Sequence, residues 1–448
     1  MSWKETRPGR FERPLTSAER FFKQYADTGI QINRELWAVS VHARFCWGGA
    51  AEDLETALRH AWKTMRFDHP EIATFAEGDT RVYQVPDHDD LLSWLTETFV
   101  VIQDSRVDDL LESIRPSRFP RLYFFPQHSD LLTQIPHWYI DGIGSICLLN
   151  NLFEALVDPR EIAFGTEPAR LSPVLEQAAS LPTDSTGTHD QAAPKLLTIL
   201  TGGLPSISVP MEHPHAIPGA TGRLAIILPN NVAQSISSVC RARKFTVTAV
   251  VHAALIAATQ ELAGPEMQSC NYTSMGAFNL RPYLAPEFVD PKAYPVSSHA
   301  CALPLTMRPS SFSANVSHLS GFYKQLAKPE TRAKVWPLLA PFLEDFFAAA
   351  RQPPPEDTPT AVGPLLDSIG IADRYLKSQY GNKVTVSGFW LGMEIQAREP
   401  LVYLWTWQGE MNLSACYNKA FHTPDRMRRL LEITRDKLLK YLDIPQSV

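Results

Sequence analysis

The apolar residues in the N-terminal part of the chain follow two different periods, which predict strands and helices in turn. Runs rich in apolar, β-branched and aromatic residues predict three strands, at 34–46, 121–125 and 130–135. An amphipathic pattern at 52–66 and an apolar run at 143–156 predict helices. Thr16 and Glu19 have the spacing of a capping box, so another helix is expected to begin there and to reach Tyr25.

The pattern is lost between Asp158 and Gly222, where nine prolines interrupt the chain. A helix is expected only at about 191–201. A segment of this length without periodicity is typical of a connection between two lobes. We therefore predict an N-terminal lobe at 1–180, a proline-rich crossover at 181–222 and a C-terminal lobe at 223–448.

Regular patterns return after residue 222 and continue almost to the end of the chain. The expected strands are 223–229, 269–280, 384–397, 401–408 and 411–417. The expected helices are 230–243, 246–263, 311–328, 331–350 and 424–442. The proline-rich stretch 351–360 is expected to be a surface linker. Alternation of strands and helices in both halves predicts an α/β fold with mixed sheets.

Size and composition agree with two folded lobes and exclude some classes of partner. The chain has 448 residues, more than one hydrophobic core normally supports. Charged residues make up 20% and aromatic residues 10%, which excludes a disordered chain. The net charge of −6 argues against a nucleic-acid partner, because such proteins need a basic surface.

The cysteines and the N-terminus indicate a cytoplasmic location. The six cysteines are scattered without a CxxC pair, which fits neither a zinc site nor a disulfide framework. The first 15 residues are polar and charged, unlike a secretory signal. No stretch has the roughly 18 uncharged apolar residues that span a membrane, so no membrane partner is expected.

The candidate chemistry lies between a predicted strand and a predicted helix. The sequence has no GxSxG, GxxxxGK[ST], HExxH or GxGxxG motif in a suitable context. It does have His137-x-x-x-Asp141-Gly142, which follows the strand 130–135 and precedes the helix 143–156. The spacing alone allows two interpretations: a buried loop histidine beside a helix-capping aspartate, or a histidine placed for catalysis.

HWYIDG, followed by an apolar helix, resembles the HxxxDG motif of the BAHD and condensation-domain superfamily of chloramphenicol-acetyltransferase-like acyltransferases. The pattern is most similar to fungal trichothecene 15-O-acetyltransferases, over most of the chain. Three further segments resemble family features: an arginine-bearing strand end at 278–284, a degenerate DFGWG at 387–392 and the ending at 402–421. Gly388 replaces the DFGWG aspartate, so its ion pair must be absent or made elsewhere. Pro136 replaces the first histidine of carrier-dependent enzymes, which favours a free acyl-CoA donor.

The resemblance implies two chloramphenicol-acetyltransferase-like lobes with a tunnel at their interface and His137 as the general base. A neutral imidazole, with an ordinary pKa near 6.5, suits proton removal from an attacking hydroxyl. Asp141 would be structural and would pair with Arg281, which could otherwise be a solvated strand end. Ser368 in DSIG is the candidate oxyanion donor, or else a turn residue.

Four other residues are candidates for substrate binding, although strand aromatics often only pack: Gly142, Trp390, Trp405 and Trp407. His252 and His299 are expected to be structural. No metal and no permanently bound cofactor is expected.

We therefore expect an acyl-CoA-dependent O-acyltransferase that acetylates a hydroxyl of a fungal-type secondary metabolite, such as a terpenoid or polyketide. Its partners would be acetyl-CoA or another acyl-CoA and a small-molecule alcohol, and it would act as a monomer. The loss of the aspartate at Gly388 keeps an alternative open, in which the same fold catalyses amide formation or cyclisation without CoA. A non-catalytic binding module is the third possibility.

Overall fold

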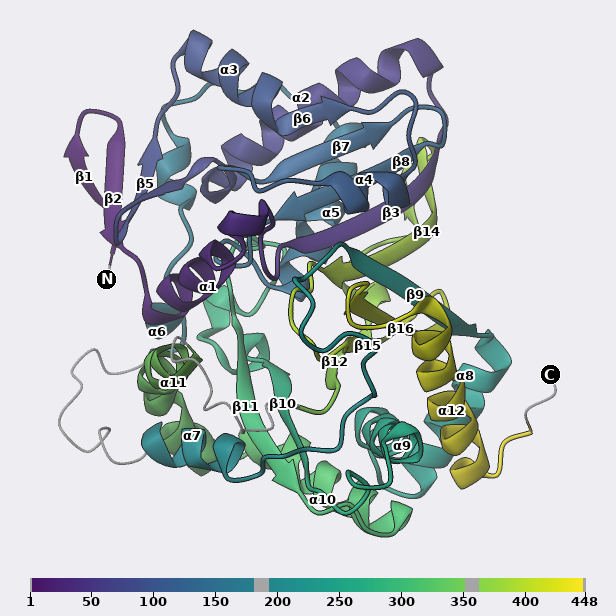
Figure 1. The fold of residues 1–448 in the computed structure, drawn as a ribbon. Coiled ribbons are helices and arrows are strands. Elements are labelled where there is room, and N and C mark those ends of the chain that lie inside the picture. Colours follow the sequence, from purple (N-terminus) through teal and green to yellow (C-terminus); the bar gives the residue numbers. More distant parts are fainter. Residues whose placement is uncertain (1, 181–192, 351–361, 446–448) are drawn as a thin grey trace. The chain divides into compact units, whose positions relative to one another are not determined.

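The structure is a computed structural model that describes residues 2–180, 193–350 and 362–445 (Figure 1). The predicted linker at 351–360 lies outside the described residues, as does the start of the predicted crossover. The chain divides into two compact units. Unit 1 is Met1–Leu181, Leu280–His299 and Asp373–Glu394, and unit 2 is Pro182–Asn279, Ala300–Ala372 and Ile395–Val448. The sequence predicted two continuous lobes, whereas two segments of the second half belong to unit 1. Long-range strand pairing joins one of them to unit 1, and local periodicity does not encode such pairing.

Unit 1 contains a six-stranded mixed sheet in the order β13-β14-β3-β8-β7-β6. Its strands are β3 (Val39–Trp47), β6 (Phe99–Val101), β7 (Arg121–Phe125), β8 (Asp130–Ile135), β13 (Gln379–Tyr380) and β14 (Val384–Met393). All neighbours are antiparallel except β6 and β7. The predictions for β7 and β8 are confirmed to the residue. β3 begins five positions later than predicted, because Trp37 has φ +64° and interrupts the extended backbone.

The helices of unit 1 cover this sheet and a smaller one. They are α1 (Ser17–Asp27), α2 (Leu54–Asp68), α3 (His88–Thr98), α4 (Val107–Ser113), α5 (Gly142–Val157) and α6 (Leu175–Ala178). The predicted capping box is present, since Thr16 and Glu19 bond each other's backbone N–H. α2 packs against α5, and α5 packs against β3, where the rings of Phe45 and Phe153 lie 5.4 Å apart. A second sheet has the order β1-β2-β5-β4, formed by Lys4–Arg7, Arg10–Pro14, Thr80–Gln84 and Phe75–Glu77.

Unit 2 is built around a second six-stranded mixed sheet, in the order β11-β10-β12-β15-β16-β9. Its strands are β9 (Thr221–Leu228), β10 (Tyr272–Asn279), β11 (Ala300–Met307), β12 (Leu365–Ile371), β15 (Leu401–Trp407) and β16 (Glu410–Asn418). β12 is parallel to both of its neighbours, and the other pairs are antiparallel. The mixed α/β fold class predicted from the sequence is confirmed.

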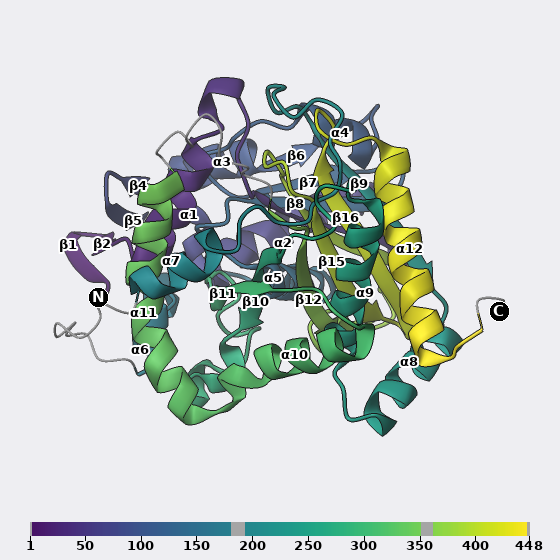
Figure 2. The same ribbon diagram turned by 60° about the horizontal axis from the view of Figure 1, so that its bottom comes forward.

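Several helices of unit 2 form its hydrophobic core together with the sheet. The helices of this unit are α7 (Ala193–Thr201), α8 (Asn230–Ala242), α9 (Val247–Leu262), α10 (Phe312–Lys324), α11 (Pro329–Ala350) and α12 (Pro424–Leu442). α9 packs against both α12 and α10, and Figure 2 shows α9 and α12 beside β15 and β16. Side chains of β15 that include Val402 and Leu404 join this core.

Among the described residues, no single helix is long and apolar enough to cross a membrane, although the bent pair α8 and α9 meets that criterion by length and composition.

Candidate active site

His137 lies in the short connection between β8 and α5, both in unit 1. The connection turns tightly, because the N–H of Tyr139 donates to the Pro136 carbonyl at 3.0 Å and that of Ile140 to the His137 carbonyl at 3.3 Å. Tyr139 and Ile140 are fully buried. The Tyr139 hydroxyl donates to the Thr74 carbonyl at 2.5 Å. The segment around His137 is therefore fixed to the unit on both sides of the turn.

The Asp141 carboxylate is directed to the start of α5 and to Arg281. It caps α5 by accepting from the Gly144 N–H at 2.8 Å, and it also accepts from the His299 N–H at 2.8 Å. Arg281 Nη1 lies 2.7 Å from Asp141 Oδ2 and 3.0 Å from Oδ1. Both side chains are buried. The aspartate is thus a helix cap and an ion-pair partner at once, while the catalytic role of His137 stays a prediction.

The surroundings of Asp141 stabilise its charged form. Burial raises the pKa of the carboxyl, but the Arg281 guanidinium and the Gly144 N–H outweigh this and hold the pKa below its ordinary value. Gly144 is required by packing, since a Cβ there would lie 2.2 Å from the Pro295 carbonyl oxygen. The second glycine after the motif histidine therefore permits a close approach of α5 to the segment at 295.

The imidazole of His137 is surrounded by aromatic rings. The ring of Phe22 on α1 stacks on it, with centroids 4.0 Å apart and an angle of 8° between planes. Trp37 lies 6.4 Å away at 55°. Burial lowers the pKa of His137, and its own backbone carbonyl and Asp141 oppose this only in part. A neutral imidazole at pH 7 is able to accept a proton.

The other predicted site residues lie in both units. Gly142 is the first residue of α5. Trp390 on β14 stacks on His42, with centroids 5.2 Å apart. In unit 2, Ser368 on β12 shares a 2.8 Å hydrogen bond with Thr248 of α9. Roles in substrate binding or oxyanion stabilisation stay predictions for these residues.

Trp405 and Trp407 lie on β15 of unit 2 and are 1% and 7% exposed. Because side chains alternate along a strand, both lie on the opposite face from Val402 and Leu404, which join the helix-covered core. They are therefore not part of that core, and their predicted contact with substrate stays a prediction.

Gly388 pairs with Arg44 across β14 and β3, at the position where the family signature has an aspartate. Arg44 instead bonds Asp130 of β8, with Nε–Oδ1 at 2.8 Å and Nη2–Oδ2 at 2.9 Å. Asp130 also lies 3.1 Å from His42 Nε2. The arginine opposite Gly388 is thus paired with an acidic residue of β8, and replacement of the family's ion pair by another residue stays a prediction.

The two other histidines singled out in the sequence have different surroundings. His252 is fully buried between the hydroxyls of Tyr323 and Tyr272, at 2.8 and 2.9 Å, and burial lowers its pKa to about 3. This confirms a structural histidine. His299 contributes its backbone N–H to Asp141, a contact that no side-chain pattern could have indicated.

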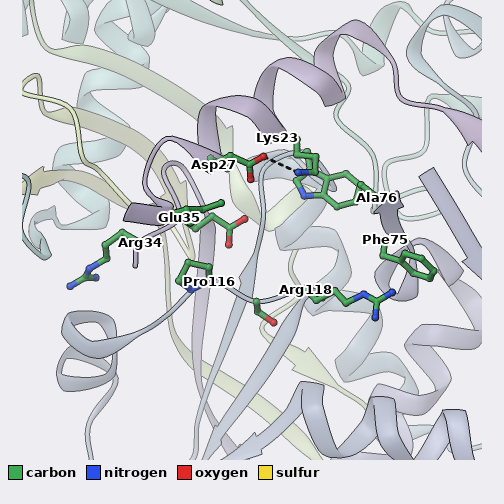
Figure 3. A pocket seen from close by; sticks show the side chains of 12 residues that line it. Lys23, Asp27, Arg34, Glu35, Phe75, Ala76, Pro116 and Arg118 are labelled. Carbon is green, nitrogen blue, oxygen red and sulfur yellow. Dashed lines mark hydrogen bonds and ion pairs between the residues drawn. The ribbon is translucent and has the colours of Figure 1, made fainter. Parts of the chain in front are cut away.

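A cavity of about 220 Å³ lies in unit 1 beside Trp138, the residue that follows His137 (Figure 3). Sequence reasoning missed it, because its wall combines α1 and β4 with the loops around residues 35 and 117. Figure 3 shows the Glu35 carboxyl between Asp27 and Pro116, and Lys23 pairs with Asp27 at 2.8 Å. Burial, assisted by Asp27, raises the pKa of Glu35 to about 8. No cluster of His, Cys, Asp and Glu in the described ranges could hold a metal ion.

Comparison with known proteins finds relatives that are similar in sequence and solved structures that are similar in fold. The chain is 30% identical to acetyltransferase pigO of Monascus ruber, with 99% of each covered. It is 27% identical to O-acetyltransferase pigM of the same organism, over 99% of this chain and 88% of that one. It is 25% identical to azaphilone biosynthesis cluster protein M of Aspergillus terreus, over 73% of this chain and 79% of that protein. No family model matches.

Among solved structures, the fold is similar to that of the TRI3 trichothecene 15-O-acetyltransferase from Fusarium sporotrichioides. The TM-score is 0.83 at 16% identity, with 98% of this chain and 97% of the other covered. The first condensation domain of the calcium-dependent antibiotic synthetase has a TM-score of 0.65 at 14% identity, with 96% of each chain covered. These likenesses confirm the two-lobed, chloramphenicol-acetyltransferase-like fold predicted from the resemblance, while the tunnel between the lobes stays a prediction.

Proposed function

We propose, since the chain belongs to the chloramphenicol-acetyltransferase-like fungal acetyltransferases, that it transfers an acetyl group from acetyl-CoA to a hydroxyl group, with His137 as the general base. Membership of this family implies acetyl transfer in secondary metabolism. We add to it that acetyl-CoA is the donor, that His137 is the base, and which class of molecule is the acceptor.

The direction of the Asp141 carboxylate carries this proposal. Its hydrogen-bond partners are the Gly144 N–H, the His299 N–H and the Arg281 guanidinium. The carboxylate is therefore occupied in holding the loop and the start of α5. His137 is left as the group of the motif that can exchange a proton, and burial favours its neutral form.

The reaction proceeds by attack of the acceptor oxygen on the thioester carbonyl. As the C–O bond forms, the hydroxyl proton moves to the imidazole of His137, and the carbonyl oxygen becomes an oxyanion. Collapse of the tetrahedral intermediate re-forms the carbonyl and breaks the C–S bond. The departing CoA thiolate takes the proton back from the imidazolium, so the base returns to its starting state.

Ser368 is proposed as the oxyanion donor. Its hydroxyl and that of Thr248 share one hydrogen bond, in which either can donate. When Thr248 donates, the Ser368 hydrogen is free for a developing negative charge. One such donor contributes about 3 kcal/mol to stabilisation of the transition state.

We propose a polyketide of the azaphilone class as the acceptor, in place of the wider choice of terpenoid or polyketide. The name of the Aspergillus terreus relative supports this choice. We also propose a cytoplasmic monomer that needs no permanent cofactor. None of the six cysteines, all of which lie in the described ranges, forms a disulfide, which is consistent with a reducing compartment.

The test is acetyl transfer by the purified protein with acetyl-CoA and a hydroxylated azaphilone. We expect release of free CoA thiol and a product heavier by one acetyl group. His137→Gln should lower kcat by about 100- to 10,000-fold, the range for loss of a general base. His128→Gln, in an exposed turn, is the matched control. Full turnover by His137→Gln would refute the base. Turnover without acetyl-CoA would favour a CoA-independent reaction on the same fold.

A further inference from the structure

Within the described parts of the chain, no other residue forms a hydrogen bond with the imidazole of His137 that could fix its plane. Its Nδ1 atom is buried and has no hydrogen-bond partner on another described residue, and its own backbone carbonyl is the nearby acceptor that acts on the ring. Bases in many enzymes are oriented by a carboxylate, but Asp141 is bound to Arg281, Gly144 and His299. Apart from this contact within the residue, the orientation of the His137 ring comes from packing.

Phe22 provides that packing. Its ring is nearly parallel to the imidazole, at 8°, and the centroids are 4.0 Å apart, so one face of the imidazole is covered. The neighbouring Phe21 does not stack on His137 and instead stacks on Tyr25, with centroids 5.6 Å apart. Only one of two adjacent phenylalanines on α1 therefore touches the candidate base.

The ring of Trp37 packs against Phe22, and the backbone of Trp37 has a strained, positive φ. Its ring lies 6.1 Å from that of Phe22 and 4.6 Å from that of Tyr25. A bulky residue with φ +64° costs free energy, and such strain is found at functional sites. The Trp37 N–H donates to the Glu394 carbonyl at 2.8 Å, which holds this conformation.

A buried ion-pair group fastens α1 near the His137 segment. Glu19 of α1 accepts hydrogen bonds from Arg13 and Arg81, all at 2.6 Å. Arg81 in turn lies over the rings of Trp138 and Tyr139, 5.0 and 5.1 Å from their centroids. α1 and the residues that follow His137 are thus bound to the same guanidinium, which fixes the distance between Phe22 and the imidazole.

We propose that Phe22 is a positioning residue for His137: its ring sets the plane of the imidazole and keeps water from one face. This inference rests on the proposed role of His137 as the base. Loss of the ring allows the imidazole to rotate and admits water. A misplacement of about 1 Å can cost 100-fold in rate, so Phe22→Ala should lower kcat by about 10- to 100-fold. The KM for acetyl-CoA should change less than about twofold, because substrate contacts are unaffected.

The experiment measures the protonation of His137 directly, by NMR titration of protein labelled in its 13 histidines. The signal of His137 is the one missing from His137→Gln. In Phe22→Ala its pKa should rise toward the ordinary value, because burial is what lowers it. Of the charged side chains in the described residues, Asp141 is the one that acts on this pKa, and the substitution leaves it in place. Phe22→Tyr, which keeps a stacked ring, should restore both the pKa and kcat.

Phe21→Ala is the matched control. Phe21 is 5% exposed and Phe22 is only partly buried, so loss of Phe21 should lower the unfolding temperature more. A purely structural role for α1 predicts that Phe21→Ala also loses more activity. The positioning role predicts the reverse order, with a smaller shift of the His137 pKa in Phe21→Ala, because the Phe21 ring reaches His137 through its 5.3 Å edge contact with Phe22.

The two hypotheses fail in different ways. If Phe22→Ala keeps the wild-type kcat and His137 pKa, the inference is overturned while His137 can still be the base. If Phe22→Ala does not fold, Phe22→Leu, which keeps bulk without a flat ring, gives the same comparison. If His137→Gln retains full turnover, the proposed role of His137 as the base fails. The positioning role of Phe22 is tested separately, because an unshifted His137 pKa in Phe22→Ala would refute it.

Discussion

Replacement of Arg281 by Met should reverse the way in which the stability of unit 1 depends on pH. Arg281 and Asp141 are 2% and 3% exposed, so the substitution leaves a carboxylate buried without its cation. Breaking a buried pair from one side costs about 3–5 kcal/mol. Two backbone N–H groups, from Gly144 and His299, still bond Asp141, so we expect about 3 kcal/mol, the lower end of that range.

The pKa of Asp141 determines the sign. In the wild type it lies below the ordinary value of 3.8, because Arg281 outweighs burial. A depressed pKa contributes stability that is present above pH 3.8 and is lost as pH falls through the lowered value. Without Arg281, burial raises the pKa instead. Stability is then greatest at low pH and is lost as pH rises through the raised value.

The assay is urea denaturation followed by tryptophan fluorescence at pH 5 and pH 8. The destabilisation of Arg281→Met relative to wild type should be larger at pH 8. Asp141→Asn combined with Arg281→Met should recover part of the lost stability, since the unpaired carboxylate at position 141 is then removed. A destabilisation below about 1 kcal/mol that is equal at both pH values would refute this account of the pair.

Two further predictions concern residues near this loop. Gly144→Ala should destabilise by about 1–3 kcal/mol and lower activity, since its Cβ would meet the Pro295 carbonyl at 2.2 Å, while Gly321→Ala, whose Cβ meets nothing within 4 Å, should not. Differential scanning fluorimetry of both variants, with the acetyl-transfer assay, checks this, and equal melting temperatures would contradict it. Glu35 has a raised pKa of about 8, so its contribution to stability is present below pH 4.5 and is lost toward pH 8. Glu35→Gln should remove that loss and gain at most about 4 kcal/mol at pH 8, measured as a flatter urea-midpoint profile from pH 5 to 8.

The sequence pattern predicted those strands and helices whose boundaries are determined by their own residues. β7, β8 and α12 were predicted to the residue, because β7 and β8 are short buried runs and α12 is amphipathic and begins at a proline. β3 was predicted to begin at 34, where the chain instead bends at Trp37. A hydrophobic pattern does not reveal a tryptophan with a positive φ. Trp37 is held in this conformation by the hydrogen bond from its N–H to the carbonyl of Glu394, which lies far along the chain.

Contacts between residues far apart in the sequence were predicted only where the resemblance to a known family implied them. It paired Asp141 with Arg281, and the structure contains that ion pair. It did not supply the bond between Arg44 and Asp130, the His299 N–H or the Phe22 stack, which depend on which strands and helices become neighbours. The grouping of β14 with unit 1 has the same cause, because its partner β3 lies in the first fifty residues.

The motif aspartate illustrates why spacing alone could not decide between a structural and a catalytic loop. Capping requires an oxygen that faces the first N–H groups of α5, and the ion pair requires an oxygen that faces Arg281. A carboxylate has two oxygens, and Asp141 meets both requirements at once. Any chain that ends a strand, turns and caps a helix with aspartate satisfies the first requirement. The buried arginine, supplied by a segment that returns from the other half of the chain, is what distinguishes this loop from an ordinary capped turn. It also leaves His137 without a carboxylate partner, which is why the stacked ring of Phe22 matters for its orientation.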